Sequence, residues 1–191
     1  MSKGRMEAFS DGVIAILITI MVLNLRVPAG SDWGALHTLV PDLLAYGLSF
    51  IFLGIYWNNH HHLLHATERI NGAILWANLH LLFWLSLIPF ATRWVASNLY
   101  AAVPAAVYGL ILLFAGAAYR VLLVTILAAQ GPDSTLATAV GGDVKGWVSV
   151  ALYAAAVPLA FLNPWIADAI YAIVALMWLV PDRRIETRLA S

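Results

Sequence analysis

The sequence contains no cysteine and few charged residues, and each shortage excludes classes of protein. Without cysteine, the 191-residue chain has no disulfide, no thiolate site and no cysteine-ligated metal. Charged residues make up 10% of the sequence, whereas soluble globular domains carry about 25%. Basic and acidic residues number 10 each, so there is no basic excess that would indicate a nucleic-acid-binding surface. Because 62% of the residues are hydrophobic, the sequence predicts an all-α protein that crosses a membrane several times.

Six hydrophobic segments follow one another along the chain, and turn-forming or polar residues connect them. They cover residues 6–27, 36–59, 72–95, 101–119, 144–162 and 165–180, and the fourth could continue helically to Gln130. Only two residues separate the last two segments, which predicts a tight antiparallel hairpin. No soluble domain and no convincing repeat is evident, so we expect residues 1–191 to form a single six-helix unit.

Basic residues are distributed unequally between the two sides that six spans define. One side would carry both termini together with Lys3, Arg5, Arg69, Arg120, Lys145, Arg183, Arg184 and Arg188. The opposite side would carry only Arg26 and Arg93. Because basic residues accumulate on the cytoplasmic side of membrane proteins, we expect both termini in the cytoplasm. The first segment lacks a small-residue cleavage pattern, so we expect it to stay in the mature chain.

The first segment carries an acid close to its apolar run. A helix needs about 20 residues to cross a hydrocarbon core of about 30 Å, and residues 12–27 are fewer than that. A spanning helix would therefore draw Phe9, Ser10 and Asp11 to the edge of the core, where an unpaired acid costs several kcal/mol. Two interpretations stay open: Ser10 and Asp11 could start the helix with Arg5 at the interface, or they could be functional residues with polar partners.

A helical projection separates the residues of the first segment into two faces. At 100° per residue, one stripe about 100° wide contains Gly12, Ile16, Thr19, Ile20 and Leu23. Ser10 and Asp11 point to the other side. An apolar stripe on a membrane helix more often packs against lipid or protein than lines a pore, so the stripe alone does not predict one.

Three sequence motifs resemble those of one membrane-protein family. They are Arg5-x-x-x-Phe9-Ser10-Asp11 in the first segment, Tyr-Trp-Asn-Asn-His-His-His at 56–62 in the second, and Asn71 with Leu-Trp-Ala-Asn-Leu at 75–79 and Ser-Leu-Ile-Pro-Phe-Ala-Thr at 86–92 in the third. The sequence is similar to the transmembrane protein 175 family, the endolysosomal potassium channels of animals and their bacterial relatives. The likeness covers the first half of the chain closely and the rest by span count. A single six-helix unit resembles the bacterial form.

The resemblance implies a homotetramer in the bacterial plasma membrane, with the first helix of each subunit lining a central pore. It implies a potassium-permeable cation channel with passive flux, for which the permeant ion is K⁺ and no cofactor is expected. Ile16 would be the narrow hydrophobic constriction, Thr19 the pore threonine, and Ile20 and Leu23 further apolar rings. Ordinary potassium channels instead use carbonyls of a Thr-Val-Gly-Tyr-Gly loop, which this sequence lacks.

Polar residues of the motif need partners inside the protein. We expect Arg5, Phe9, Ser10 and Asp11 to hold the first helix against its neighbours at the cytoplasmic end. The candidate partners are Trp57, His60 and His61 of the second segment and Asn78 of the third. An indole N–H only donates, which suits a carboxylate.

The histidine run at 60–62 and 65 also permits a metal hypothesis. His61 and His65 are four residues apart and could chelate from one helical face, but no acid stands beside them, and Glu68 is the nearest downstream carboxylate. We therefore expect no metal, and instead a cluster at the cytoplasmic interface that could tune a response to pH.

Two other functions are weighed against a channel. A small cation- or proton-coupled secondary transporter could use Asp11 as a relay, but transporters often show matched interrupted helices. Here Pro89 and Pro158 lie late in the third and fifth segments, without such a pairing. A membrane enzyme would need a converging acid, base or nucleophile, which the sequence does not offer.

Overall fold

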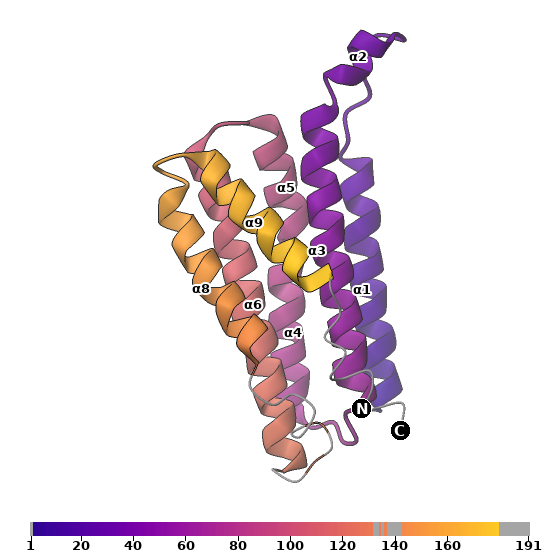
Figure 1. Cartoon of the computed structure of the whole chain (residues 1–191). Coiled ribbons are helices and arrows are strands. Elements are labelled where there is room, and N and C mark those ends of the chain that lie inside the picture. Colours follow the sequence, from indigo (N-terminus) through magenta and orange to yellow (C-terminus); the bar gives the residue numbers. More distant parts are fainter. Residues whose placement is uncertain (1, 132–133, 135, 137–142, 180–191) are drawn as a thin grey trace.

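The computed structural model describes residues 2–131, 134, 136 and 143–179, and every regular element in this part of the chain is a helix (Figure 1). The helices are α1 (Lys3–Leu23), α2 (Trp33–His37), α3 (Val40–His65), α4 (Gly72–Ser86), α5 (Ile88–Ser97), α6 (Ala102–Gln130), α8 (Val144–Leu159) and α9 (Pro164–Leu179).

Four stretches of the described chain are long and apolar enough to cross a membrane. They are α1, α3, the stretch Gly72–Ser97 that contains α4 and α5, and α6. Helices α8 and α9 are apolar but have 16 residues each, fewer than the roughly 20 that a full crossing needs. The prediction of an all-helical protein with several membrane spans is confirmed, and six complete spans stay a prediction.

Helix α1 starts earlier and ends earlier than the expected segment 6–27. It begins at Lys3, so Ser10 and Asp11 lie inside it, and the interpretation of these residues as a helix start is wrong. It ends at Leu23, four residues before Val27, which precedes Pro28 and is therefore biased away from helical backbone.

The other expected segments agree with the helices apart from their ends. Helix α6 takes the longer of the two expected forms and continues to Gln130, where Gly131 follows with a φ of 88°, a conformation that glycine adopts readily. The third segment is interrupted at Leu87, because Pro89 lies in the first turn of α5 and has no N–H to donate. The predicted ends at Val180 and the basic residues Arg183, Arg184 and Arg188 lie outside the described residues.

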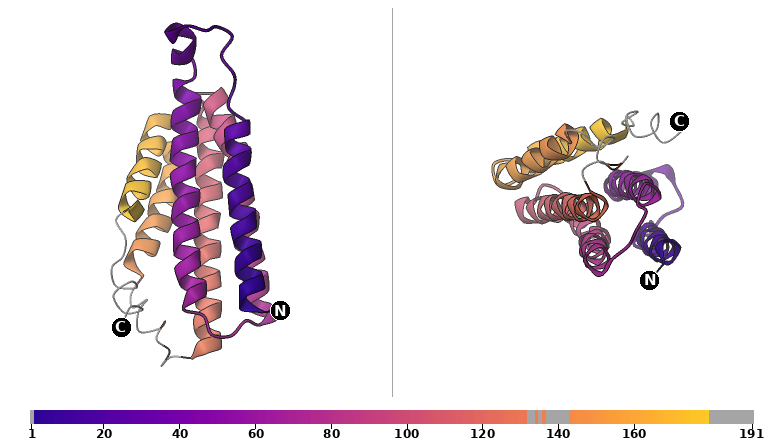
Figure 2. Two further views of the ribbon diagram at one scale, coloured as in Figure 1. Left: turned by 90° about the vertical axis from the view of Figure 1, so that its right-hand side faces the viewer. Right: turned by 90° about the horizontal axis from the view of Figure 1, so that it is seen from below.

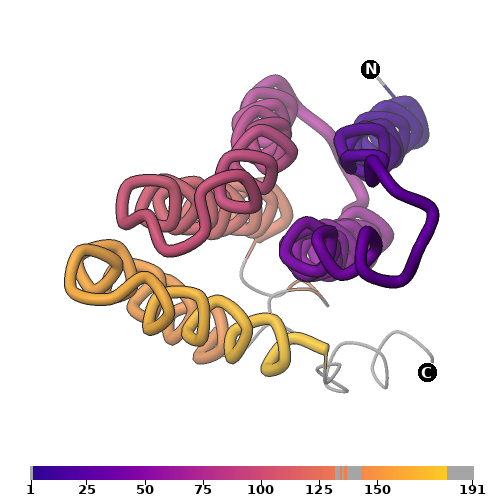
Figure 3. Tube along the Cα trace, turned by 90° about the horizontal axis from the view of Figure 1, so that it is seen from above, coloured from indigo at the N-terminus to yellow at the C-terminus, as the bar shows by residue number. Residues whose placement is uncertain are grey.

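Helix α1 lies at the edge of the bundle, and the α8–α9 hairpin lies at another edge (Figures 2 and 3). α1 packs against α3, α4 and α5, whereas α8 packs against α6, and α9 against α6 and α3. The short helix α2 stands beyond the upper ends of α1 and α3 in Figure 1. α1 therefore has one side on the bundle and one side that no other described element covers.

The lower end of the bundle in Figure 1 gathers most of the described basic residues. Lys3 and Arg5 lie in the first turn of α1, Arg69 lies between α3 and α4, and Lys145 lies in the first turn of α8. Arg26 and Arg93 lie toward the opposite end, after α1 and in α5. The cytoplasmic location of the N-terminus stays a prediction from this distribution.

Close contact between α6 and α9 requires a glycine. Tyr171 of α9 is fully buried and its hydroxyl donates a hydrogen bond to the carbonyl of Ala105 over 3.0 Å. A Cβ atom on Gly109 would lie 2.1 Å from this hydroxyl oxygen. Gly109 therefore leaves the space that the phenol of Tyr171 occupies.

We predict that Gly109→Ala lowers the free energy of unfolding by about 1–3 kcal/mol, because the added methyl overpacks a site with no room to relax. Gly54→Ala is the matched control, since a Cβ there meets nothing within 4 Å and alanine favours a helix. Thermal unfolding of both variants in detergent measures the difference. Equal melting temperatures would contradict the packing at Gly109.

Candidate functional site

Helix α1 presents two chemically different faces. The residues that face the bundle are buried, and they are Met6, Ser10, Ile14, Leu17 and Met21. The stripe defined by Gly12, Ile16, Thr19, Ile20 and Leu23, here called the outer stripe, is exposed on the surface of the subunit, with Ile16 57% and Leu23 80% exposed. The structure thus places the residues expected to line a pore on the side of α1 that no other described helix covers.

A chain of hydrogen bonds joins α1 to α3 and α4 through buried side chains. The Asn78 amide nitrogen donates to the hydroxyl of Ser10 over 3.0 Å, and that hydroxyl donates to the carbonyl of Met6 over 2.9 Å. His60 Nε2 lies 2.7 Å from the carboxamide oxygen of Asn78. Because that oxygen only accepts, Nε2 carries the proton and donates.

The three side chains that form these hydrogen bonds are buried, and none of their fully covered polar atoms lacks a partner. Ser10, His60 and Asn78 are at most 2% exposed, and no buried side-chain nitrogen or oxygen in the described part of the chain lacks a hydrogen bond. A buried polar group without a partner costs about 1–3 kcal/mol. The three side chains therefore fix the angle and depth of α1 relative to α3 and α4.

Asp11 is held by an indole. The Nε1–H of Trp57 in α3 donates to a carboxylate oxygen of Asp11 over 3.0 Å, and the ring of His61 stacks on Trp57 with centroids 6.1 Å apart. The half-buried carboxylate therefore has a donor from a neighbouring helix. His61 supports the indole instead of contacting the motif by a hydrogen bond.

Arg5 and Phe9 lie on the outer side of α1, away from these contacts. Both are exposed, Phe9 by 49%, and the Arg5 side chain makes no hydrogen bond or ion pair with another residue that the structure describes. The structure brings Ser10, Asp11, Trp57, His60 and Asn78 together and leaves these two residues out.

The remaining histidines form ring contacts at the end of α3. The ring centroid of His61 lies 5.7 Å from that of His62 and 6.2 Å from that of His65. Lys3 donates to the carbonyl of His65 over 2.7 Å and so ties the start of α1 to this end. Across residues 2–131, 134, 136 and 143–179, no three His, Asp or Glu side chains converge as a metal site would require.

A second anchor, which the sequence reasoning missed, fixes the other end of α1. Asp42 of α3 is 4% exposed, and its carboxylate lies 3.4 Å from Arg26 Nη2 and 3.6 Å from Arg93 Nη1. Arg93 also donates to the backbone carbonyl of Asn24, just past the end of α1. The signal was present, since Arg26 and Arg93 are the two basic residues expected on that side and Asp42 is an acid inside the second apolar segment, 36–59.

We predict that Asn78→Leu lowers the free energy of unfolding by about 1–3 kcal/mol, because His60 loses its buried acceptor while the side-chain volume is kept. Asn58→Leu on α3 is the control, since Asn58 is exposed. Thermal unfolding of the purified variants measures the effect. Equal stability of the two variants would show that the buried hydrogen bonds of Ser10, Asn78 and His60 do not hold α1.

The segments that carry these hydrogen bonds are also similar to known proteins. A family profile described as the endosomal/lysosomal potassium channel TMEM175 matches residues 5–89, which include Ser10, Trp57, His60 and Asn78. A potassium channel of Chryseobacterium sp. (strain P1-3) is 51% identical over 189 residues, which are 99% of this chain and 98% of that protein. The chain belongs to the TMEM175 family. The predicted family membership is confirmed.

A solved structure and an animal relative extend the comparison. The crystal structure of a lysosomal potassium-selective channel TMEM175 homolog from Chamaesiphon minutus superposes with a TM-score of 0.81 at 29% identity, and the match covers 93% of this chain and 96% of that chain. The human endosomal/lysosomal proton channel TMEM175 is 38% identical over 96 residues, which are 44% of this chain and 19% of the human protein. These relatives are named as channels, and the family is not one of enzymes.

Proposed function

We propose that the chain is the subunit of a potassium-permeable cation channel, a homotetramer in the bacterial plasma membrane with α1 lining a central pore. The observation that carries the proposal is the division of α1 into an anchored inner face and an exposed outer stripe. The family membership and the names of the bacterial relatives support potassium as the permeant ion.

Several subunits are needed to enclose a pore, because α1 lies at the edge of a single subunit (Figure 3). Copies of the outer stripe facing one another would surround the axis with Ile16, Thr19, Ile20 and Leu23. The number four rests on the family resemblance.

Ile16 would control ion passage by its apolar side chain. A narrow apolar ring disfavours a continuous column of water and closes a pore by dewetting. When such a ring opens only slightly, an ion must lose part of its water, and K⁺ holds that water less tightly than Na⁺. Ile16 thus accounts for both gating and a modest potassium preference without a loop of carbonyls.

Thr19 supplies the polar atoms of the stripe. Its hydroxyl donates to the carbonyl of Ile16 over 2.9 Å within α1, so its proton is directed back to the helix. The oxygen keeps lone pairs that can accept from water or coordinate a cation. A ring of Thr19 hydroxyls would partly replace water lost at Ile16.

Asp11 serves as a clamp in this proposal, not as a proton relay. Its carboxylate accepts from Trp57 and so holds α1 to α3 beside the Ser10–Asn78–His60 chain. The transporter alternative needs a carboxylate that exchanges partners during each cycle, and the family names do not favour it.

We predict that Ile16→Asn raises the single-channel current several-fold and weakens the preference for K⁺ over Na⁺, because a polar ring keeps the neck hydrated. Ile173→Asn on α9 is the matched control, since Ile173 and Ile16 are 56% and 57% exposed. Bilayer recordings under K⁺/Na⁺ gradients measure both quantities. Unchanged conductance and selectivity in Ile16→Asn would rule out Ile16 as the constriction.

We also predict passive flux. Purified protein in liposomes with an outward K⁺ gradient and no other permeant ion should release K⁺ until an inside-negative diffusion potential opposes the release, since a channel needs no coupled ion. The release is followed with a potential-sensitive dye. A strict requirement for a proton or sodium gradient would favour the transporter instead.

A further inference from the structure

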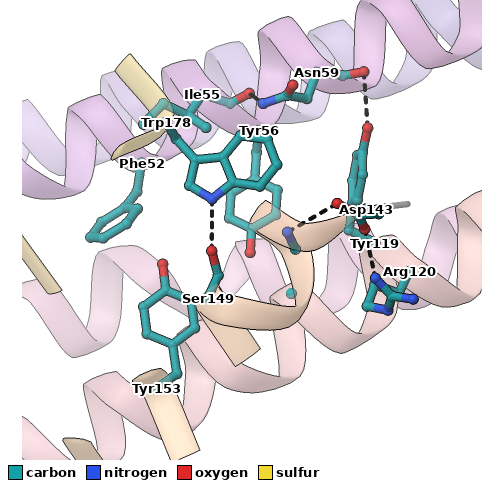
Figure 4. A pocket seen from close by; sticks show the side chains of 12 residues that line it. Phe52, Ile55, Tyr56, Asn59, Tyr119, Arg120, Asp143, Ser149, Tyr153 and Trp178 are labelled. Atoms are coloured by element: carbon teal, nitrogen blue, oxygen red, sulfur yellow. Dashed lines mark hydrogen bonds and ion pairs between the residues drawn. The ribbon is translucent and has the colours of Figure 1, made fainter. Parts of the chain in front are cut away.

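A cavity of about 50 Å³ lies between α3, α6, α8 and the end of α9 (Figure 4). It is separate from the outer stripe of α1. The same two turns of α3 serve both regions, because Tyr56 and Asn59 line the cavity while Trp57 and His60 bind Asp11 and Asn78. Whatever occupies the cavity therefore contacts the helix that anchors α1.

Most polar groups around the cavity are already paired within the protein. Trp178 Nε1 donates to the Ser149 hydroxyl over 2.8 Å, and that hydroxyl donates to the carbonyl of Lys145 over 2.8 Å. Arg120 and Asp143 form an ion pair of 2.6 Å at the wall, so their formal charges cancel. A charged occupant would find no free counter-charge among these residues.

Two phenol hydroxyls at the cavity are not paired with another described residue. Tyr153 of α8 is 3% exposed, yet its hydroxyl makes no hydrogen bond to the described protein, and the hydroxyl of Tyr56 makes none either. Both residues line the cavity, and Figure 4 shows their hydroxyls turned toward Ser149. In the described part of the chain, every side-chain nitrogen or oxygen that is fully covered has a hydrogen-bond partner. The two unpaired phenol oxygens are therefore not fully covered, and they border the cavity space.

The chemistry of these groups selects the occupant. Each phenol can donate one hydrogen bond to an occupant. The Ser149 hydroxyl already donates to the carbonyl of Lys145, so toward an occupant it can only accept. The occupant must therefore both accept and donate, and it must be neutral. A water molecule needs about 10–15 Å³ of cavity volume, whereas a cavity that binds benzene has about 150 Å³. A volume of about 50 Å³ therefore has room for roughly three water molecules.

We propose that this cavity is a binding site for a small cluster of water molecules, and that the cluster bridges Tyr56 of α3 to Tyr153 and Ser149 of α8. The α8–α9 hairpin is thereby joined to α3 on this side through water, next to the turns of α3 that hold α1. Gly116 of α6 keeps the space open, because a Cβ there would lie 3.7 Å from Val150 and 3.8 Å from the Tyr56 hydroxyl.

Radiolytic hydroxyl-radical footprinting of the full chain in liposomes tests the proposal, because radicals formed from bound water modify the adjacent side chain. We expect Tyr153 to be modified several-fold faster than Tyr171. Tyr171 is the internal control, since it is equally buried but its hydroxyl donates to Ala105 within tight packing. Equal protection of both tyrosines would mean that protein or lipid fills the cavity, and would overturn the proposal.

Gly116→Leu provides the matched change, because its side chain extends into the cavity. Modification of Tyr153 should fall to the level of Tyr171, while that of the exposed Tyr100 stays the same. Gly116→Ala, whose Cβ fits at ordinary contact distances, should lower the rate by less and serves if the leucine variant does not fold. An unaltered Tyr153 rate in both variants would place the water elsewhere. The readout does not depend on conduction, so it stands apart from the potassium flux test.

Discussion

The position of α1 depends on one carboxamide, that of Asn78. In an apolar bundle a polar group must find a partner or cost free energy, and Asn78 provides partners for two helices at once by donating to Ser10 and accepting from His60. Aliphatic packing alone would let α1 rotate or slide at small cost, because one branched side chain resembles another. The directional bonds at one end and the Asp42 ion pairs at the other remove that freedom.

The sequence alone predicted the features that depend on local composition and on the spacing of residues around a helix. The low charge and the long apolar runs predicted an all-helical membrane protein, and the 100° period placed Ser10 apart from Ile16 before any neighbour was known. The choice of Trp57, His60 and Asn78 as partners was a hypothesis from donor and acceptor chemistry, and the structure brings all three to the motif. Arg5 was expected in the same network, but it lies on the exposed side of α1, where its side chain makes no hydrogen bond or ion pair with another described residue.

Features that depend on contacts between distant residues were not predictable. The interruption at Leu87 follows from Pro89, but whether a proline bends or divides a helix depends on what packs around it. The shared use of Asp42 by Arg26 and Arg93 needs three segments to meet. Gly116, Tyr56 and Tyr153 line the cavity beside α3 and come from three different helices. The residue pattern within a single helix therefore cannot predict this cavity.

The division of α1 into two faces has a consequence for how such channels can diversify. Substitutions on the outer stripe touch none of the hydrogen bonds that hold the helix, so in the proposed channel they would change the wall of the conduction path without unfolding the subunit. Substitutions at Ser10 or Asn78 have no such freedom. A lineage could therefore explore different permeant ions on a fixed scaffold, which fits a family whose members carry the names of both potassium and proton channels.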